Sequence, residues 1–171
     1  AAEVGVNGFG INHGQDARPL NNNSSYTILC FAAPVAEARR SHVFLQGTEN
    51  SPYPQYLLAM NTDFNGGAQS GRFAMLEYDN AWKFRSQSTG AHIDGRAHTF
   101  CISRSGPNAQ AYVDGNPVAT TVGGENSTHF ASNHSLIIGG SDISSSRYAN
   151  YPIYLVAVID GSITPDEAKS I

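Results

Sequence analysis

The feature that most constrains this 171-residue chain is a series of short segments rich in β-branched and aromatic residues, separated by turn signals. Such segments are typical of strands, and their regular recurrence is typical of a β-sandwich or barrel. Asp114-Gly115 predicts a tight two-residue turn, because both residues tolerate positive φ, and Asp79-Asn80 predicts another. Strands are expected at residues 26–33, 42–47, 55–61, 72–78, 81–87, 98–104, 109–114, 117–121, 135–139 and 152–160.

Helix is expected in only two short places. Val35 to Arg40 could form one or two turns after Pro34. The segment Thr164-Pro165-Asp166-Glu167 has the pattern of a capping box with proline at the first helical position. No linker or repeat interrupts the pattern, so residues 1–171 are predicted to form a single domain. No apolar run approaches the ~20 residues that span a bilayer.

Composition narrows the class of protein. Only 14% of residues are charged and 40% are hydrophobic, which excludes disorder and suits a secreted or virion-surface β protein. The net charge of −4, with no basic cluster beyond Arg39-Arg40, argues against nucleic acid as a partner. The first residue is Ala, so we expect a processed protein or a fragment of a longer one.

The two cysteines lie in predicted strands, Cys30 in Tyr26-Thr-Ile-Leu-Cys-Phe-Ala32 and Cys101 in His98-Thr-Phe-Cys-Ile-Ser103. A disulfide between them would stabilise the fold by about 4 kcal/mol in the chain-entropy model and would indicate an oxidising compartment. Two separate buried thiols fit the same pattern, because free cysteine is among the most buried residue types. The strands alone leave both alternatives open.

Motifs for catalysis are missing from the sequence. No carboxylates have the alternating spacing that would align an acid and a base on one strand face, and no nucleophile elbow or phosphate loop occurs. His92, Asp94 and His98 come nearest to a cluster, for which a surface or hydrogen-bonded role is the default interpretation over metal binding or acid–base catalysis. The chain is therefore predicted not to be an enzyme and to require no cofactor.

Several ordered segments resemble laminin-G-like and pentraxin-like domains. His98-Thr-Phe-Cys-Ile-Ser103 leads into the hairpin Ala109-Gln-Ala-Tyr-Val-Asp-Gly-Asn-Pro-Val118, and Ser135-Leu-Ile-Ile-Gly-Gly140 is similar to the next strand of those domains. Tyr154 to Asp160 and Ile163 to Ala168 resemble their closing strand and helical turn. The resemblance covers residues 26–171. It implies a concanavalin A-like fold, an all-β jelly-roll sandwich of two antiparallel sheets with a short C-terminal helical turn.

The pentraxin-like branch is closest in pattern, and this likeness implies a disulfide and a calcium site. It implies a bond between Cys30 and Cys101, although Cys30 is displaced by one residue from the pentraxin position. Side chains alternate faces along a strand, so this offset decides whether the bond can form. Of the calcium ligands, only Asp142 and Glu49 have counterparts, so a double site is not expected and one weakly held calcium ion is possible.

Domains of this fold often bind carbohydrate, for which aromatic faces and planar polar groups are the useful side chains. Two loops are enriched in them, residues 49–56 and residues 142–151. Trp82, the single tryptophan, is an alternative platform. The candidate carbohydrate-binding residues are Tyr53, Tyr56, Asp142, Arg147, Tyr148 and Trp82.

The sequence therefore favours a non-catalytic, lectin-like module that recognises a glycan or cell-surface polysaccharide on a secreted or virion-surface protein. One alternative is a structural or attachment module that forms homo-oligomers or assembles into a larger particle. Another is a polysaccharide lyase or hydrolase of the same sandwich class, since fold alone does not fix function.

Overall fold

The computed structural model describes residues 11–12, 25–47, 55–63, 68–78, 81–123, 136–140 and 147–171. In this part of the chain, strands account for almost all regular structure. The elements are β1 (Ile11–Asn12), β2 (Ser25–Ala32), β3 (Ser41–Gly47), β4 (Gln55–Thr62), β5 (Ala68–Tyr78), β6 (Trp82–Ser88), β7 (His98–Ser105), β8 (Asn108–Val113), β9 (Asn116–Val118), β10 (Thr120–Gly123), β11 (Leu136–Ile138), β12 (Ile153–Asp160) and α1 (Pro165–Lys169).

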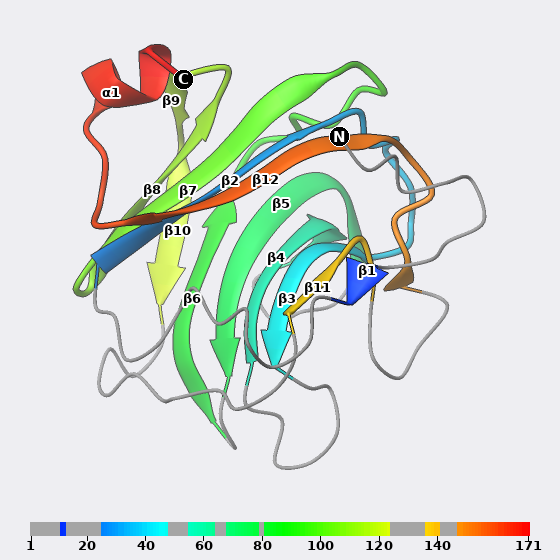
Figure 1. Cartoon of the computed structure of the whole chain (residues 1–171), viewed down its shortest axis with the longest axis horizontal. Coiled ribbons are helices and arrows are strands. Elements are labelled where there is room, and N and C mark those ends of the chain that lie inside the picture. The colour runs from blue at the N-terminus through cyan, green and yellow to red at the C-terminus, as the bar shows by residue number, and fades with distance from the viewer. Residues whose placement is uncertain are drawn as a thin grey trace.

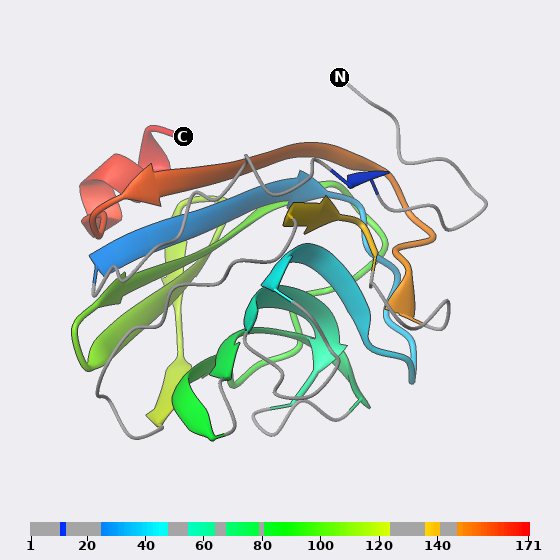
Figure 2. The same cartoon turned by 60° about the horizontal axis from the view of Figure 1, so that its bottom comes forward.

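The strands form two antiparallel sheets that pack face to face (Figure 1). One sheet has the order β1-β11-β3-β4-β5-β6-β10, and the other has the order β12-β2-β7-β8-β9. Figure 2 shows the seven-stranded sheet curving beneath the flatter five-stranded layer. This arrangement confirms the predicted jelly-roll sandwich. We call the side of each sheet that faces the other sheet its inner face, and the opposite side its outer face.

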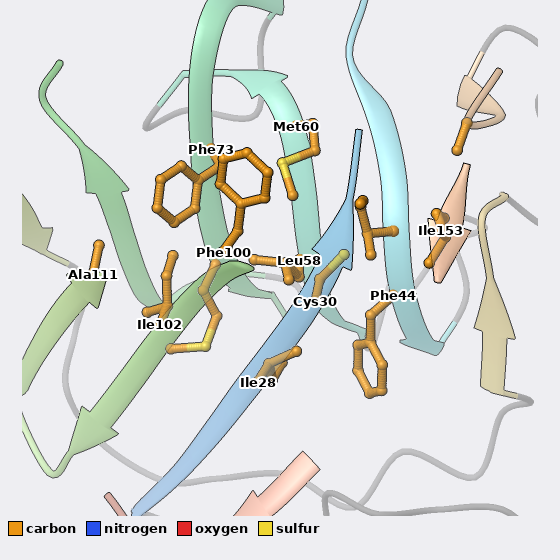
Figure 3. Packing of buried hydrophobic residues seen from close by; sticks show 14 of the residues in the cluster. Ile28, Cys30, Phe44, Leu58, Met60, Phe73, Phe100, Ile102, Ala111 and Ile153 are labelled. Carbon is orange, nitrogen blue, oxygen red and sulfur yellow. The ribbon is translucent and has the colours of Figure 1, made fainter. Parts of the chain in front are cut away.

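Strand alternation places the core between the sheets. On β2 and β7 the inner-face partners are Tyr26 with Arg104, Ile28 with Ile102, and Cys30 with Phe100. The seven-stranded sheet contributes Phe44, Leu58, Met60, Phe73 and Met75 to the same cluster. Figure 3 shows these aliphatic and aromatic side chains converging between the layers. Burial of this apolar area, at about 25 cal/mol per Å², is the main stabilising contribution to the fold.

The predicted disulfide is wrong, because both thiols are free and buried. Cys30 is opposite Phe100, whereas Cys101 is opposite Leu29. Residues one position apart on a strand point to opposite faces, so Cys30 enters the core between the sheets and Cys101 points to the outer face. The one-residue offset of Cys30 is therefore retained in the fold, with no bulge between β2 and β7 to restore the facing.

The turn at Asp114-Gly115 is confirmed. Asp114 has φ of 50° and Gly115 has φ of 72°, the left-handed pair that a type I′ hairpin needs. A Cβ atom at Gly115 would lie 2.6 Å from the Lys169 Cα, so the turn packs directly against α1. Asp79-Asn80 lies outside the described residues, although β5 and β6 on either side of it do pair.

The predicted C-terminal helix is confirmed and the other helix is wrong. Thr164 caps α1, and its hydroxyl and the Glu167 side chain form a reciprocal capping box. Residues 33–40 contain no helix, because Asn61 holds the backbone of this segment in place: its Nδ2 donates to the Val35 carbonyl at 2.8 Å and its Oδ1 accepts from the Glu37 N–H at 3.3 Å. The predicted strand 117–121 is split at Ala119 into β9 and β10, which belong to different sheets.

A fully buried polar triad lies within the apolar core. The Glu77 carboxylate of β5 accepts hydrogen bonds from the Tyr26 hydroxyl of β2 and from the Arg104 guanidinium of β7. Arg104 also donates from Nε to the Gly106 carbonyl at 2.9 Å, and its Cζ lies 4.1 Å from the centre of the Phe84 ring. Burial raises the pKa of the Glu77 carboxyl, and Arg104 acts in the opposite direction. The triad thus joins the two sheets.

We expect either partner of the Glu77–Arg104 pair to be costly to remove alone. Glu77→Leu or Arg104→Met leaves a buried charge without compensation and should lower the free energy of unfolding by about 3–5 kcal/mol. The double variant should lose clearly less than the sum of the two single losses, as measured by urea denaturation. Additive losses would contradict this coupling.

The burial of both cysteines has a chemical consequence. Burial raises the pKa of the Cys101 thiol to about 12 and moves the pKa of Cys30 further in the same direction. Because only the thiolate reacts, a thiol reagent at neutral pH should modify the folded protein slowly. Unfolding without reductant should make both thiols react at once. An unfolded protein that shows no reactive thiol before reduction would contradict the free-thiol structure.

Candidate functional site

The outer face of the seven-stranded sheet carries a second apolar cluster, whose members alternate with the inner-face core along the same strands. Leu57 pairs with Leu45 on β3 and with Leu76 on β5, which places all three on one face. The buried members are Leu45, Leu57, Ala59, Ala74, Leu76 and Ile137, with the partly buried Trp82 packed against them. These side chains are covered in the folded chain, so a ligand on this face can meet only the partly exposed residues beside them, of which Trp82 is one.

Three side chains form an aromatic and cationic group at one end of this face, which we call the Trp82 platform: Tyr78, Trp82 and Arg85. The Tyr78 ring meets the Trp82 ring edge to face, with centroids 4.9 Å apart and planes at 79°. The Arg85 Cζ lies 5.2 Å from the centre of the Trp82 ring, within cation–π range. All three side chains are partly exposed. The platform therefore offers a rigid aromatic surface beside a planar hydrogen-bond donor.

Basic side chains gather at the opposite end of the same strands. His42 pairs with Ala59 on the outer face and is completely buried. Burial lowers the pKa of His42, and the charges of Arg40 and Arg147 lower it further. Burial and Arg147 also lower the pKa of Arg40 to about 10, whereas Asp63 raises it. This basic end, which comprises Arg40, His42 and Arg147, therefore holds a neutral imidazole near two guanidinium groups.

The predicted binding residues have different outcomes. Tyr56 is wrong as a binding residue, because it is fully buried on the inner face, edge to face with Tyr26 at 6.0 Å. Trp82, Arg147 and Tyr148 are partly exposed. Trp82 begins β6, whereas Arg147 lies near His42 at the start of β3, so the two belong to opposite ends of the sheet. Tyr53, Asp142 and Glu49 lie outside the described residues.

Sequence reasoning missed Tyr78, Arg85, Arg40 and His42 as members of these two ends. Tyr78 had a partial signal, because it stands beside the predicted turn at 79–80 and so lies close to Trp82. Its direct pairing with Trp82 depends on a register shift after Glu77, which the turn does not predict. Arg40 and His42 had none, because their proximity to Arg147 depends on how distant segments meet.

The described residues offer little for a metal ion. No three His, Cys, Asp or Glu side chains among them come together in a metal-binding arrangement. Since the two calcium candidates, Asp142 and Glu49, lie outside this part of the chain, no step of the proposed function is assigned to calcium.

Two residues of the predicted acid–base cluster, Asp94 and His98, do meet. Together with Asp114 they form a hydrogen-bonded group that we call the His98 clasp. His98 Nδ1 is 2.6 Å from Asp114 Oδ2, and His98 Nε2 is 3.1 Å from Asp94 Oδ1. Asp114 Oδ1 also accepts from the Thr99 N–H at 2.9 Å. His92 is not part of this group, because its ring packs edge to face on Phe73 at 6.3 Å. The clasp links the loop before β7 to the β8–β9 turn, so its geometry indicates a structural role.

A hollow of about 310 Å³ lies on the outer face of the five-stranded sheet, beside the segment that leads to α1. It is lined by Ser103, Ser105, Asn108, Ala109, Gln110, Ser162 and Ile163. Ser103 Oγ already accepts from Thr27 Oγ1 and from the Ile163 N–H. None of the lining residues is a carboxylate or a histidine, so the hollow carries no acid–base pair.

No described helix is long and apolar enough to cross a membrane.

The fold and sequence together define the class of protein. The chain belongs to the concanavalin A-like lectin/glucanases superfamily, whose laminin-G-type family profile matches residues 10–169. No curated protein is detectably similar in sequence.

Solved structures of low sequence identity share the fold. Domain 4 of AbnA, a GH43 extracellular arabinanase from Geobacillus stearothermophilus solved with arabinotriose, is 13% identical with a TM-score of 0.66, over 94% of this chain and 71% of that one. The CBM40 of a Ruminococcus gnavus IT-sialidase, bound to α2,3-sialyllactose, is 12% identical with a TM-score of 0.61, over 88% and 82%. A pentraxin from Limulus polyphemus is 14% identical with a TM-score of 0.59, over 88% and 70%.

The His98 clasp predicts a dependence of stability on pH. Its hydrogen bond to Asp114, and then its contacts with Asp94, raise the pKa of His98 above the unfolded value of about 6.5. The stabilisation is complete below that unfolded value and is lost as the pH rises through the raised pKa of the folded state.

Wild type and His98→Gln should therefore differ most in unfolding free energy at mildly acidic pH, and less as the pH rises. Urea denaturation across this range, with an NMR titration of the His98 ring, measures both quantities. A His98 that titrates below its unfolded value would contradict the clasp.

Proposed function

We propose that this domain binds carbohydrate without transforming it, and that the Trp82 platform is the principal contact surface. Membership of the superfamily and the carbohydrate-bound neighbours support glycan as the ligand class. The single observation that carries the choice of site is the partly exposed Trp82 ring, held by Tyr78 and Arg85 on the outer face of the seven-stranded sheet.

The physical argument rests on what a sugar offers. A pyranose or furanose has C–H groups that pack on an aromatic face, and hydroxyls that take hydrogen bonds in the plane of a neighbouring donor. Trp82 supplies the apolar area, and the guanidinium of Arg85 can donate to two adjacent oxygens. Because Tyr78 fixes the indole edge to face, little side-chain entropy is lost when a sugar binds.

A second region supports a longer glycan. We propose that Arg147 and Tyr148, with Asp142 as predicted from sequence, contact a more distant sugar unit. The basic end, with Arg40 beside Arg147, favours a unit that carries a carboxylate. Its separation from Trp82 along the strands suits a chain of several sugar units rather than a monosaccharide.

Carbohydrate binding is favoured over catalysis for this domain, because its described carboxylates are engaged elsewhere. Glu77, a fully buried carboxylate, is engaged by Tyr26 and Arg104 in the core, and Asp94 and Asp114 are engaged by His98. A hydrolase needs two carboxylates that face one sugar, and no described pair lies on the outer face beside Trp82. We accordingly assign the domain a recognition role, which fits a secreted or surface-attached protein.

Trp82→Ala should lower the affinity for a bound soluble oligosaccharide at least tenfold, because it removes the stacking face. Trp82→Phe, which keeps a smaller aromatic face, should lose less, and Arg85→Met should lose hydrogen bonding while keeping apolar area. Glycan arrays identify the ligand, and isothermal titration calorimetry in solution then measures each affinity.

Tyr154→Ala is the matched control, because Tyr154 is an exposed aromatic residue on the other sheet. It should leave the solution affinity unchanged. Unchanged binding by a folded Trp82→Ala variant would refute the platform as the site. Conversion of the oligosaccharide to shorter products, detected by a reducing-end assay, would refute the non-catalytic role.

A further inference from the structure

Strand β12 is the one long, unprotected edge of the described sheets. Natural edge strands avoid pairing with other chains by being short or by carrying proline or charge. The other terminal strands obey this rule: β1 has two residues, β9 has three and includes Pro117, and β10 has four. In contrast, β12 has eight residues, and Ile153 to Ile159 contain neither a charge nor a proline.

The outer face beside this edge is also apolar. Phe31 of β2 and Tyr154 pack with ring centroids 5.0 Å apart, yet they remain 38% and 47% exposed. Leu155, opposite Phe31 in the register, is 50% exposed. We call Phe31, Tyr154 and Leu155 the edge patch. These large apolar side chains add area to whatever pairs with β12, because they lie directly against the edge.

We propose that β12 pairs with β12 of a second copy of this chain, in antiparallel orientation about a two-fold axis. The occupant is a second copy because the strand is complementary to itself. When the two-fold axis is perpendicular to the sheet, the outer faces of both copies lie on the same side of the joined sheet. Two residues that oppose each other across the axis must therefore both belong to the outer face or both to the inner face. With Ala157 at the axis, Leu155 faces Ile159 and Val156 faces Val158 of the other copy, so the pairs next to the axis are apolar. Tyr154 faces Asp160 at the two ends of the paired segment.

Charge favours this orientation over the parallel one. Asp160 is the single charged residue of β12. Parallel in-register pairing would set the two Asp160 carboxylates side by side, which is unfavourable. Antiparallel pairing about Ala157 separates their positions by six residues, or about 20 Å along the strand. The small side chain of Ala157 at the axis also permits close approach of the two backbones.

The result is a continuous ten-stranded sheet made from two five-stranded sheets. Backbone hydrogen bonds of the ladder give the geometry, and the two edge patches extend the buried area beyond a single strand pair. The edge patches are needed for a stable dimer, because stable interfaces bury about 800 Å² per partner, more than one strand pair supplies.

Sedimentation equilibrium over a range of concentrations tests the proposal. Wild type should sediment as a dimer, and Leu155→Lys should raise the dimer dissociation constant about tenfold or more, since it places a charge opposite Ile159. Val122→Lys is the matched control: Val122 is 36% exposed on β10, an edge of the other sheet, and its variant should remain dimeric.

Cross-linking tests the register without adding charge. Ala157→Cys should form an intermolecular disulfide under mild oxidation, because opposed Cα atoms lie about 5 Å apart. Asp160→Cys should not, since its positions are far apart in the antiparallel pair. A wild type that is monomeric at every concentration, a dimer that Leu155→Lys leaves intact, or cross-linking at residue 160 but not at 157 would each overturn the proposal. None of these readouts depends on carbohydrate binding.

Discussion

The buried interaction between Glu77, Arg104 and Tyr26 constrains the rest of the structure, because it is a polar contact that only one registration of the two sheets satisfies. Tyr26 and Arg104 are opposed on β2 and β7, and Glu77 reaches them from β5. A slip of one residue on any of these strands would turn the polar group to the outer face and leave its partners buried and uncompensated. The apolar core stabilises the sandwich, and the triad selects its alignment.

The same constraint orients the proposed binding surface. Glu77 and Phe84 are opposed on β5 and β6, and both point inward to Arg104. The residues that follow them, Tyr78 and Arg85, therefore point outward, where they contact Trp82. The platform and the core triad thus lie on opposite faces of the same strand pair, β5 and β6. A substitution that disturbs the triad should also disturb the platform, so loss of binding is informative only when the stability of the variant is known.

Local patterns predicted much of the fold because the relevant physics is local. The Asp114-Gly115 turn depends on φ preferences of two residues, and the Thr164 capping box depends on a spacing of three. The helix expected at Val35 to Arg40 was wrong because Asn61, a distant residue, bonds that backbone. The cysteine pairing was wrong for a related reason: the resemblance supplied the strands, whereas the facing depends on a register that a one-residue offset reverses.

Tyr56 illustrates why the site was harder to predict than the fold. Its position at the start of the predicted strand 55–61, next to a polar loop, suggested exposure, but on β4 it shares the inner face with Glu77, its partner on β5. Composition cannot distinguish an aromatic residue that stacks on a ligand from one that fills the core. Likewise, the pattern of β12 identifies a strand but not its place at the end of a sheet, which follows from strand order alone.

The two proposed surfaces lie on different sheets and far apart in strand order, which has a consequence for affinity. β12 approaches β3, whereas β6, which carries Trp82, approaches β8 at the other side of the sandwich. Pairing through β12 would therefore leave both platforms open. Two sites in one dimer convert the second contact with a polysaccharide into an intramolecular step, so avidity can exceed the single-site affinity by about 10²–10⁴ when the spacing fits the ligand. Weak stacking at one tryptophan would then suffice for firm attachment to a repetitive glycan.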